Sequence, residues 1–220
     1  MSETQRGKDH IHEGQPVLAA GMPLEQSRVA VVMLHGRGAS ADSILSLHRE
    51  LDVSRVTYLA PQAHSSSWYP QRFLAPTASN EPWITSALNV ISQVLRHLET
   101  VGIDAERTIL MGFSQGACLA LEYAARYGRR YGGIAGLSGG LIGADDEPRQ
   151  DSGHLEGTPV FLGCSDVDFH IPMQRVEHAG RVLQERGAQV TIQFYPRMGH
   201  TINHDEIDAV RAMIAALIHA

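Results

Sequence analysis

The stretch that decides the fold reads Thr108-Ile109-Leu110-Met111-Gly112-Phe113-Ser114-Gln115-Gly116-Ala117-Cys118-Leu119-Ala120. An apolar run typical of a buried β-strand leads directly into a G-x-S-x-G motif, and the small apolar residues that follow favour a helix. In so sharp a turn from strand to helix the central residue is strained, and the flanking glycines avoid a clash with the neighbouring chain. The segment therefore predicts that Ser114 projects above the end of a sheet.

Outward from this segment, short apolar runs alternate with longer helical patterns along the chain. The apolar runs predict strands at residues 29–34, 56–60, 108–111, 133–137, 159–163 and 190–195, with a further edge strand near 16–20. Apolar residues at helical spacing predict helices over 83–98, over 174–186, and from about 203 onward, where Asn203 and Glu206 fit a capping box. Continuous apolar strands are typical of parallel sheets. The predicted class is α/β, with a mainly parallel central sheet of about six to seven strands and helices on both faces.

The G-x-S-x-G pattern occurs a second time, as Gly136-Leu137-Ser138-Gly139-Gly140. Because the chain contains 21 glycines, the pattern alone is weak evidence. Ser114 has a predicted strand before it and a predicted helix after it, whereas Ser138 is followed by glycines and an acidic loop. We therefore expect Ser114 to be a nucleophile and Ser138 to be a structural residue at a strand end.

A serine nucleophile needs a general base and an acid that orients the base. In this type of elbow the chain order is serine, then acid, then histidine. His200 follows the last predicted strand and is the predicted base, whereas His204 falls in the first turn of the final helix. Asp166 and Asp168 both follow the strand at 159–163. We favour Asp168, which is followed by a proline that can open the next helix, and expect Asp166 to shape the loop.

The same chemistry needs backbone N–H groups that stabilise a developing oxyanion. One belongs to the residue after the nucleophile, which is Gln115, and the other to a loop after an early strand. The segment His35-Gly36-Arg37-Gly38 follows the strand at 29–34, and its glycines allow N–H groups to face a cavity. Arg37 and Gln115 are the predicted donors. A phosphate-binding turn is the alternative for this loop, but the sequence lacks the G-x-G-x-x-G and P-loop patterns.

Four segments together resemble the phospholipase/carboxylesterase family of the α/β-hydrolases, which includes acyl-protein thioesterases and bacterial carboxylesterases. They are the L-H-G-x-G-like segment 34–38, the G-F-S-Q-G elbow 112–116, the D-x-x-[V/I]-P-like loop 168–172, and the G-M-G-H-like segment 198–200. The resemblance spans residues 34–201 in the family's order. It implies an α/β-hydrolase fold and a catalytic triad of Ser114, Asp168 and His200, and so selects Asp168 over Asp166.

The chain departs from this family pattern at two places. Arg37 stands where acyl-protein thioesterases usually have leucine, and the segment from 61 to 83 is shorter and more aromatic than their substrate-covering loop. Asn80-Glu81-Pro82-Trp83 instead resembles bacterial members labelled dienelactone-hydrolase-like. These departures argue against a long-chain lipid or acyl-protein substrate.

Two stretches, residues 61–82 and 139–158, contain no convincing helix or strand. Long irregular stretches inside a compact domain are usually functional or disordered. The aromatic residues Trp68, Phe73 and Trp83 are predicted walls of a substrate pocket, with ordinary packing of loop aromatics as the alternative. We expect residues 1–14 to be a flexible tail in which His10 and His12 are solvated rather than bound to metal, and residues 15–220 to form a single domain.

Composition excludes several other classes of protein. The 220 residues carry 18 Lys and Arg against 24 Asp and Glu, a formal charge of −6, which argues against nucleic-acid or anionic-membrane partners. No apolar run approaches the length of a membrane span, so we expect no stable membrane insertion. The polar N-terminal residues and two cysteines in apolar segments favour a cytoplasmic location. We expect no metal or cofactor, and the family resemblance allows a homodimer.

The predicted function is a serine hydrolase that cleaves short or medium acyl or aryl carboxylic esters through an acyl-enzyme on Ser114. The same triad has alternative substrates, which are thioesters, lactones of the dienelactone type and lysophospholipids. Peptide hydrolysis and perhydrolysis are alternative reactions. A ligand-binding module that keeps this fold with little turnover is the alternative of another class.

Overall fold

The strand Val29–Leu34 (β2) shows how the two faces of the sheet are covered. In the computed structural model, which describes residues 10–219, all 6 residues of this strand are buried. Val31 and Met33 pack in one hydrophobic cluster, and Val32 and Leu34 pack in the other. Because alternate side chains of a strand point to opposite faces, a strand with no polar position must be covered on both. This explains why the chain needs helices on each side of the sheet.

The central sheet has seven strands in the order β1-β3-β2-β4-β5-β6-β7. Strand β1 at one edge is antiparallel to β3, and every other neighbouring pair is parallel. The predicted α/β class and mainly parallel sheet are therefore confirmed, including the edge strand. Besides β2, the strands are β1 (Val17–Gly21), β3 (Val56–Pro61), β4 (Thr108–Phe113), β5 (Gly133–Leu137), β6 (Pro159–Ser165) and β7 (Gln189–Tyr195).

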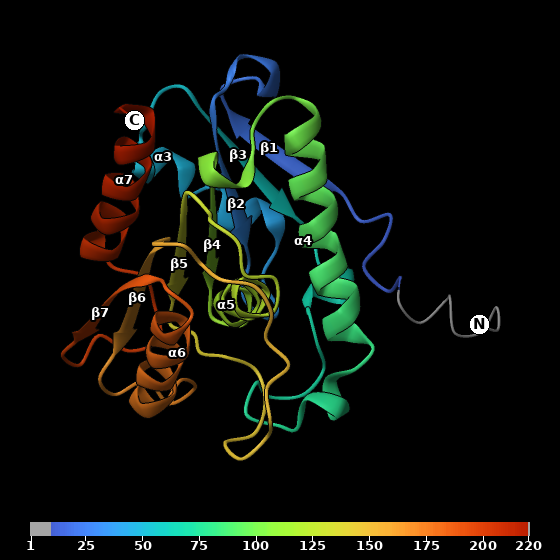
Figure 1. Ribbon diagram of the computed structural model, residues 1–220, viewed down its shortest axis with the longest axis vertical. Coiled ribbons are helices and arrows are strands. Elements are labelled where there is room, and N and C mark those ends of the chain that lie inside the picture. Colours follow the sequence, from blue (N-terminus) through green and yellow to red (C-terminus); the bar gives the residue numbers. More distant parts are fainter. Residues whose placement is uncertain (1–9, 220) are drawn as a thin grey trace.

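Helices lie on both faces of the sheet, and Figure 1 shows α4 and α7 flanking it on opposite sides. One face is covered by α4 (Trp83–Thr100), α5 (Gln115–Arg126) and α6 (Met173–Glu185). The other is covered by α2 (Ala41–Leu45), α3 (His48–Leu51) and α7 (His204–His219). The short helices α2 and α3 were not predicted, because 5 and 4 residues are too few to show helical spacing.

The irregular stretch 61–82 contains only single turns of helix, and residues 139–158 contain none. Residues 61–82 include the 3₁₀ turns η2 (His64–Ser66) and η3 (Thr77–Asn80), and two further turns are η1 (Leu24–Gln26) and η4 (Ala105–Arg107). Glu147 ties the two stretches together, because its carboxylate accepts hydrogen bonds from the backbone N–H (2.9 Å) and hydroxyl (3.1 Å) of Thr77. Hydrogen bonds between segments far apart in sequence therefore replace regular structure here.

The prediction that His12 is solvated is wrong, while residues 1–9 of the predicted tail lie outside the described part of the chain. His12 is buried, and its backbone N–H donates to the Ser86 hydroxyl at 3.0 Å. Its ring accepts the His64 N–H at Nδ1 and donates from Nε2 to the Trp68 carbonyl, both at 3.0 Å. Burial lowers the pKa of His12. These partners require the neutral ring, so this histidine fixes the segment to the domain instead of being solvated.

Two glycines allow the sharp turn between β4 and α5. A Cβ atom on Gly116 would lie 2.1 Å from the carbonyl oxygen of Leu34, and one on Gly112 would lie 2.3 Å from the backbone of Gly116. Both neighbours are backbone atoms, which cannot rotate away as a side chain can. Gly116 is thus required by the close approach of α5 to β2, and Gly112 by the close approach of β4 to the first turn of α5.

The predicted capping box at the start of α7 is confirmed. The backbone N–H of Asn203 donates to Glu206 Oε2, and the backbone N–H of Glu206 donates to Asn203 Oδ1, both at 2.9 Å. Glu206 is fully buried against Gly163, and its Oε1 has no hydrogen-bond partner within residues 10–219. Burial raises the pKa of Glu206 to about 7. The cap therefore carries a carboxyl group whose ionisation is costly.

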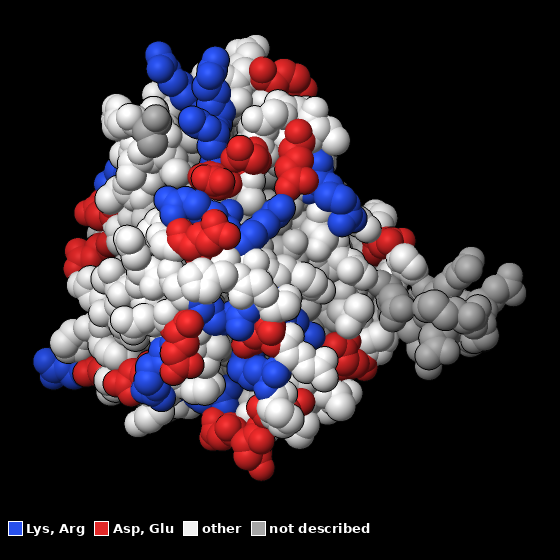
Figure 2. Space-filling view, in the orientation of Figure 1, with Lys and Arg blue, Asp and Glu red and all other residues white. Residues whose placement is uncertain are grey.

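Charged side chains of both signs are interspersed over the face of the molecule seen in Figure 2.

No helix within residues 10–219 is both long enough and apolar enough to cross a membrane.

Replacing Gly116 by alanine is expected to lower the free energy of unfolding by about 3 kcal/mol or more, because β2 and α5 must separate to admit the methyl group. Thermal or urea unfolding measures the change. Gly36→Ala is the matched control, since a Cβ there meets its nearest neighbour, the Cβ of Ser114, at 3.4 Å. Equal stability of the two variants would contradict this interpretation of the turn.

Glu206 is expected to make the protein less stable as the pH rises. Its pKa is about 7 in the folded chain against an ordinary 4.5, so between these values the unfolded state releases a proton that the folded state retains. Glu206→Gln keeps a cap acceptor but does not ionise. Urea unfolding should show the variant gaining stability over the parent from pH 5 to pH 8. Below pH 4.5, the ordinary pKa of glutamate, the unfolding free energies of the two proteins should change with pH in the same way. Parallel pH profiles would rule the effect out.

Candidate active site

Ser114 lies between the end of β4 and the first residue of α5 in a rarely adopted backbone conformation, with φ 54° and ψ −119°. Its backbone N–H donates to the carbonyl of Leu137 on the neighbouring strand β5 at 2.9 Å. The side chain is half-buried. Positive φ is costly for a residue with a side chain, and the hydrogen bond to β5 helps to hold it. This conformation fixes the direction in which the Ser114 hydroxyl leaves the sheet.

Three side chains from separate loops form one chain of hydrogen bonds. Nε2 of His200 lies 2.8 Å from the Ser114 hydroxyl, and Nδ1 of His200 lies 2.6 Å from Oδ2 of Asp168. The rings of Phe113 and His170 pack beside the imidazole at centroid distances of 4.9 and 4.8 Å. The structure thus brings together the three residues that the sequence singled out, with the imidazole between hydroxyl and carboxylate as nucleophilic catalysis requires.

The carboxylate of Asp168 is fully satisfied although its side chain is completely buried. Besides the contact to His200, its Oδ1 accepts the backbone N–H groups of His170 at 2.8 Å and Ile171 at 3.1 Å. Burial by itself raises the pKa of Asp168, but the hydrogen bonds from His200 and the two N–H groups outweigh it, and the pKa is lowered. An ionised Asp168 holds the proton of His200 on Nδ1 and leaves Nε2 free to accept from Ser114.

The loop that carries His200 is held by hydrogen bonds to the end of β6 and the residue that follows it. The Ser165 hydroxyl accepts the Gly199 N–H at 3.2 Å, and Asp166 Oδ1 accepts the Arg197 N–H at 2.7 Å. Asp166 therefore contacts the backbone of the histidine loop and not the imidazole. The other two alternatives lie outside the hydrogen-bonded chain: His204 is exposed at the start of α7, and Ser138 is buried after β5 with its N–H bonded to Gly163.

The two predicted oxyanion donors both have unused backbone N–H groups. Gln115 is the first residue of α5, so its N–H has no acceptor inside the helix, and neither it nor the Arg37 N–H bonds to another described residue. The following loop residue is different, because Gly38 donates to Ser66 at 2.7 Å. A Cβ on Gly36 would come within 3.4 Å of Ser114, which shows how closely this loop approaches the hydroxyl-bearing residue.

The side chains of the same two residues hold the aromatic loop over the site. Gln115 accepts the Trp68 N–H with its Oε1 and donates from Nε2 to the Tyr69 carbonyl, both at 2.8 Å. The Arg37 guanidinium donates to the carbonyls of Pro70 at 2.8 Å and Gln71 at 2.5 Å. Arg37 and Gln115 thus place the 68–73 segment beside Ser114.

A cavity of about 500 Å³ opens at Ser114 and His200. Phe73 lines it, as predicted, together with Ile171 and Cys118. The prediction that Trp68 and Trp83 line the pocket is wrong. Trp68 is fully buried beneath the loop, with its indole N–H bonded to the His35 carbonyl at 2.9 Å, and Trp83 packs near His12 at the start of α4. Trp68 therefore supports the loop from within, Trp83 packs against His12 and His64, and neither lines the cavity at Ser114.

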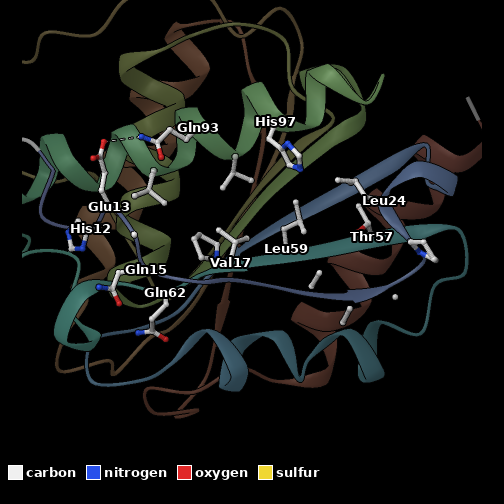
Figure 3. A pocket seen from close by; sticks show the side chains of 18 of the residues that line it. His12, Glu13, Gln15, Val17, Leu24, Thr57, Leu59, Gln62, Gln93 and His97 are labelled. Atoms are coloured by element: carbon white, nitrogen blue, oxygen red, sulfur yellow. Dashed lines mark hydrogen bonds between the residues drawn. The ribbon is translucent and has the colours of Figure 1, made fainter.

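A second cavity of about 530 Å³ lies between α4 and the β1 edge of the sheet. In Figure 3, Gln93 and His97 of α4 face Leu59 and Thr57 of β3 across it. It contains none of the triad residues, so the cavity at Ser114 is the candidate active site. Within residues 10–219, no group of three or more His, Cys, Asp and Glu side chains is arranged to hold a metal ion.

Several residues of the site gave no signal in the sequence. The Gln115 side chain bonds to a segment 46 and 47 positions away, and Ser165 supports a glycine 34 positions away. No local pattern encodes such contacts. Position after a strand could have suggested Ser165, which ends β6, by the same rule that indicated Asp168 and His200.

Comparison with known proteins agrees with the resemblance noted in the sequence. The Phospholipase/Carboxylesterase family matches residues 21–218. The chain is 41% identical to a crystal structure of a phospholipase/carboxylesterase from Dyadobacter fermentans, with a TM-score of 0.88 over 92% of this chain and 97% of that one. It is 26% identical to acyl-protein thioesterase 1 of Yarrowia lipolytica over 89% of this chain and 95% of that protein. It is 24% identical to a probable SOBER1-like carboxylesterase of Arabidopsis thaliana, covering 86% and 78%.

The family match covers nearly all of the described chain, and the fold and the order of the four motifs agree with it. The protein is therefore an α/β-hydrolase that belongs to the phospholipase/carboxylesterase family, a family of ester and thioester hydrolases.

Proposed function

We propose that this chain hydrolyses carboxylic esters through an acyl-enzyme on Ser114. The observation that carries the proposal is the continuous contact from Ser114 through His200 to Asp168, with distances of 2.8 and 2.6 Å. The Ser114 oxygen attacks the carbonyl carbon while His200 Nε2 takes its proton, and the carbonyl electrons move onto oxygen. Asp168 stabilises the resulting imidazolium without accepting its proton. The N–H groups of Arg37 and Gln115 stabilise the oxyanion.

The same groups catalyse the formation of the acyl-enzyme and its hydrolysis. When the oxyanion collapses, the bond to the leaving alcohol breaks and His200 delivers its proton to that oxygen. Water next attacks the acyl carbon with His200 again as the base, and the acid product leaves as the proton returns to Ser114. Every proton therefore passes through Nε2 of His200, which must accept from the serine in one step and donate to the leaving group in the next.

Short or medium acyl and aryl esters are the substrates we propose. The supporting features are the size of the cavity, about 500 Å³, and the hydrogen bonds that tie the 68–73 segment to Arg37 and Gln115. Thioesters are the second candidate, because one relative named above is called an acyl-protein thioesterase and a thioester carbonyl suits the same attack. A thiolate is a better leaving group than an alkoxide, so the triad needs no change to accept it.

Ser114→Ala is expected to lower kcat for p-nitrophenyl butyrate by at least about 10³-fold, because no hydroxyl remains to form the acyl-enzyme. The melting temperature should hardly change. Ser138→Ala is the matched control, since it removes the serine of the second G-x-S-x-G copy, whose hydroxyl has no hydrogen-bond partner within the described residues. Parallel assays with the matching butyryl thioester measure whether the protein also hydrolyses thioesters. Retained turnover in the Ser114 variant would remove this residue from the mechanism.

Asp168→Asn is expected to reduce kcat by about 10³- to 10⁴-fold, because an amide can donate to Nδ1 and so stabilise the wrong tautomer of His200. Asp166→Asn serves as the comparison: it keeps an oxygen for the Arg197 N–H and should cost far less. The rates of the two variants with p-nitrophenyl butyrate decide between the two aspartates. A larger loss in the Asp166 variant would reverse the assignment of the acid.

A further inference from the structure

The cavity at Ser114 has an unusual charge pattern along its lining. Two arginines, Arg37 and Arg72, contribute to it, and the described residues that line it include no aspartate or glutamate. Both arginines are exposed, as are Pro70 and Gln71 between them, whereas Phe73 and Cys118 are buried. The guanidinium groups therefore belong to the mouth of the cavity, and the apolar side chains of Phe73 and Cys118 lie further inside, near the catalytic residues.

Neither charge is neutralised by a carboxylate of the described chain. The Arg37 guanidinium donates to the carbonyls of Pro70 and Gln71, which are uncharged, and Arg72 makes no side-chain hydrogen bond or ion pair to residues 10–219. Arg175 gives the contrast. It lies 5.5 Å from the ring centre of Phe73, and it is paired with Asp145 at 2.5 Å. The positive charge beside the triad is therefore left for a ligand.

The backbone that carries Arg72 is fixed, which gives its side chain a defined origin. The Arg72 backbone carbonyl accepts from Nδ2 of the Asn80 side chain at 3.2 Å, and the preceding Gln71 N–H donates to Oδ1 of the same side chain at 2.7 Å. Asn80 itself is fully buried. Because a guanidinium presents parallel donors that match a carboxylate, an arginine that extends from a fixed backbone at the mouth suits recognition of that group.

The local charge also opposes the charge of the whole chain. With a formal net charge of −6, the molecule as a whole repels anions, yet Arg37 and Arg72 are the only Lys, Arg, Asp or Glu side chains among the described residues that line its catalytic cavity. Interactions at such an entrance act over about a Debye length and raise the local concentration of an oppositely charged substrate.

We propose that the natural substrate is an ester or thioester carrying a carboxylate, which Arg72 binds at the cavity mouth while Arg37 adds positive charge beside it. The inference rests on the proposed hydrolysis at Ser114 and adds the class of substrate. The apolar inner wall of Phe73 and Ile171 accommodates the part of the molecule next to the scissile bond. The carboxylate remains outside, where both guanidinium groups are exposed.

Two pairs of esters test the proposal. Mono-p-nitrophenyl adipate and p-nitrophenyl hexanoate differ by a carboxylate at the end of the acyl chain, and para-butyryloxybenzoate and para-butyryloxybenzamide differ by one on the leaving group. In at least one pair, kcat/KM should be about fivefold to tenfold higher for the anionic member, mainly through KM. The ratio should fall as the salt concentration rises. The pair that shows the preference identifies the side of the ester that faces Arg72.

Variants of Arg72 separate this binding role from general electrostatics. Arg72→Gln should bring the anionic-to-neutral ratio close to one, and Arg72→Lys should restore part of it. Arg96→Gln, which removes the same charge from an exposed position on α4 outside this cavity, should leave the ratio as in the parent. Turnover of the neutral esters without any anionic preference, or a preference that survives Arg72→Gln, overturns the inference but not the proposed function. Failure to hydrolyse all four esters overturns both.

Discussion

The close approach of α5 to β2 at Gly116 is the constraint on which the rest of the site depends. It lets the chain turn from strand to helix within one residue, and that residue is Ser114, held at φ 54°. A wider turn would carry the hydroxyl away from the edge of the sheet where the loops after β6 and β7 end. The strain at this position is therefore balanced by packing of the small residues of α5 on the sheet.

Around this turn, hydrogen bonds within and between the loops hold the parts of the site in place. Asp168 takes two backbone N–H groups in addition to the imidazole, Ser165 and Asp166 hold the histidine loop, and Gln115 holds the aromatic loop. These contacts are short and partly buried, so the site is arranged before any ligand arrives. Preorganised donors and fixed charges of this kind account for much of the rate enhancement that enzymes achieve.

The sequence predicted those parts of the structure that local pattern encodes. Strand β2 could be recognised because a strand buried on both faces must be apolar throughout, and Ser114, Asp168 and His200 could be chosen because each follows a strand in the order that the elbow requires. Trp68, Trp83 and His12 were misjudged for the opposite reason. Their positions depend on one another and on Ser86 and His35, which are distant in the sequence, and a tryptophan in a loop looks the same whether it supports the loop or meets a substrate.

The central claim is that the hydroxyl of Ser114 is the activated nucleophile. Reaction with a fluorophosphonate followed by peptide mapping tests it most directly, because the two G-x-S-x-G serines fall in different tryptic peptides, residues 108–126 and 131–149. The account predicts one adduct per chain, on Ser114 in the first peptide. An adduct on Ser138 in the second peptide, or no adduct while esters are still hydrolysed, would contradict it.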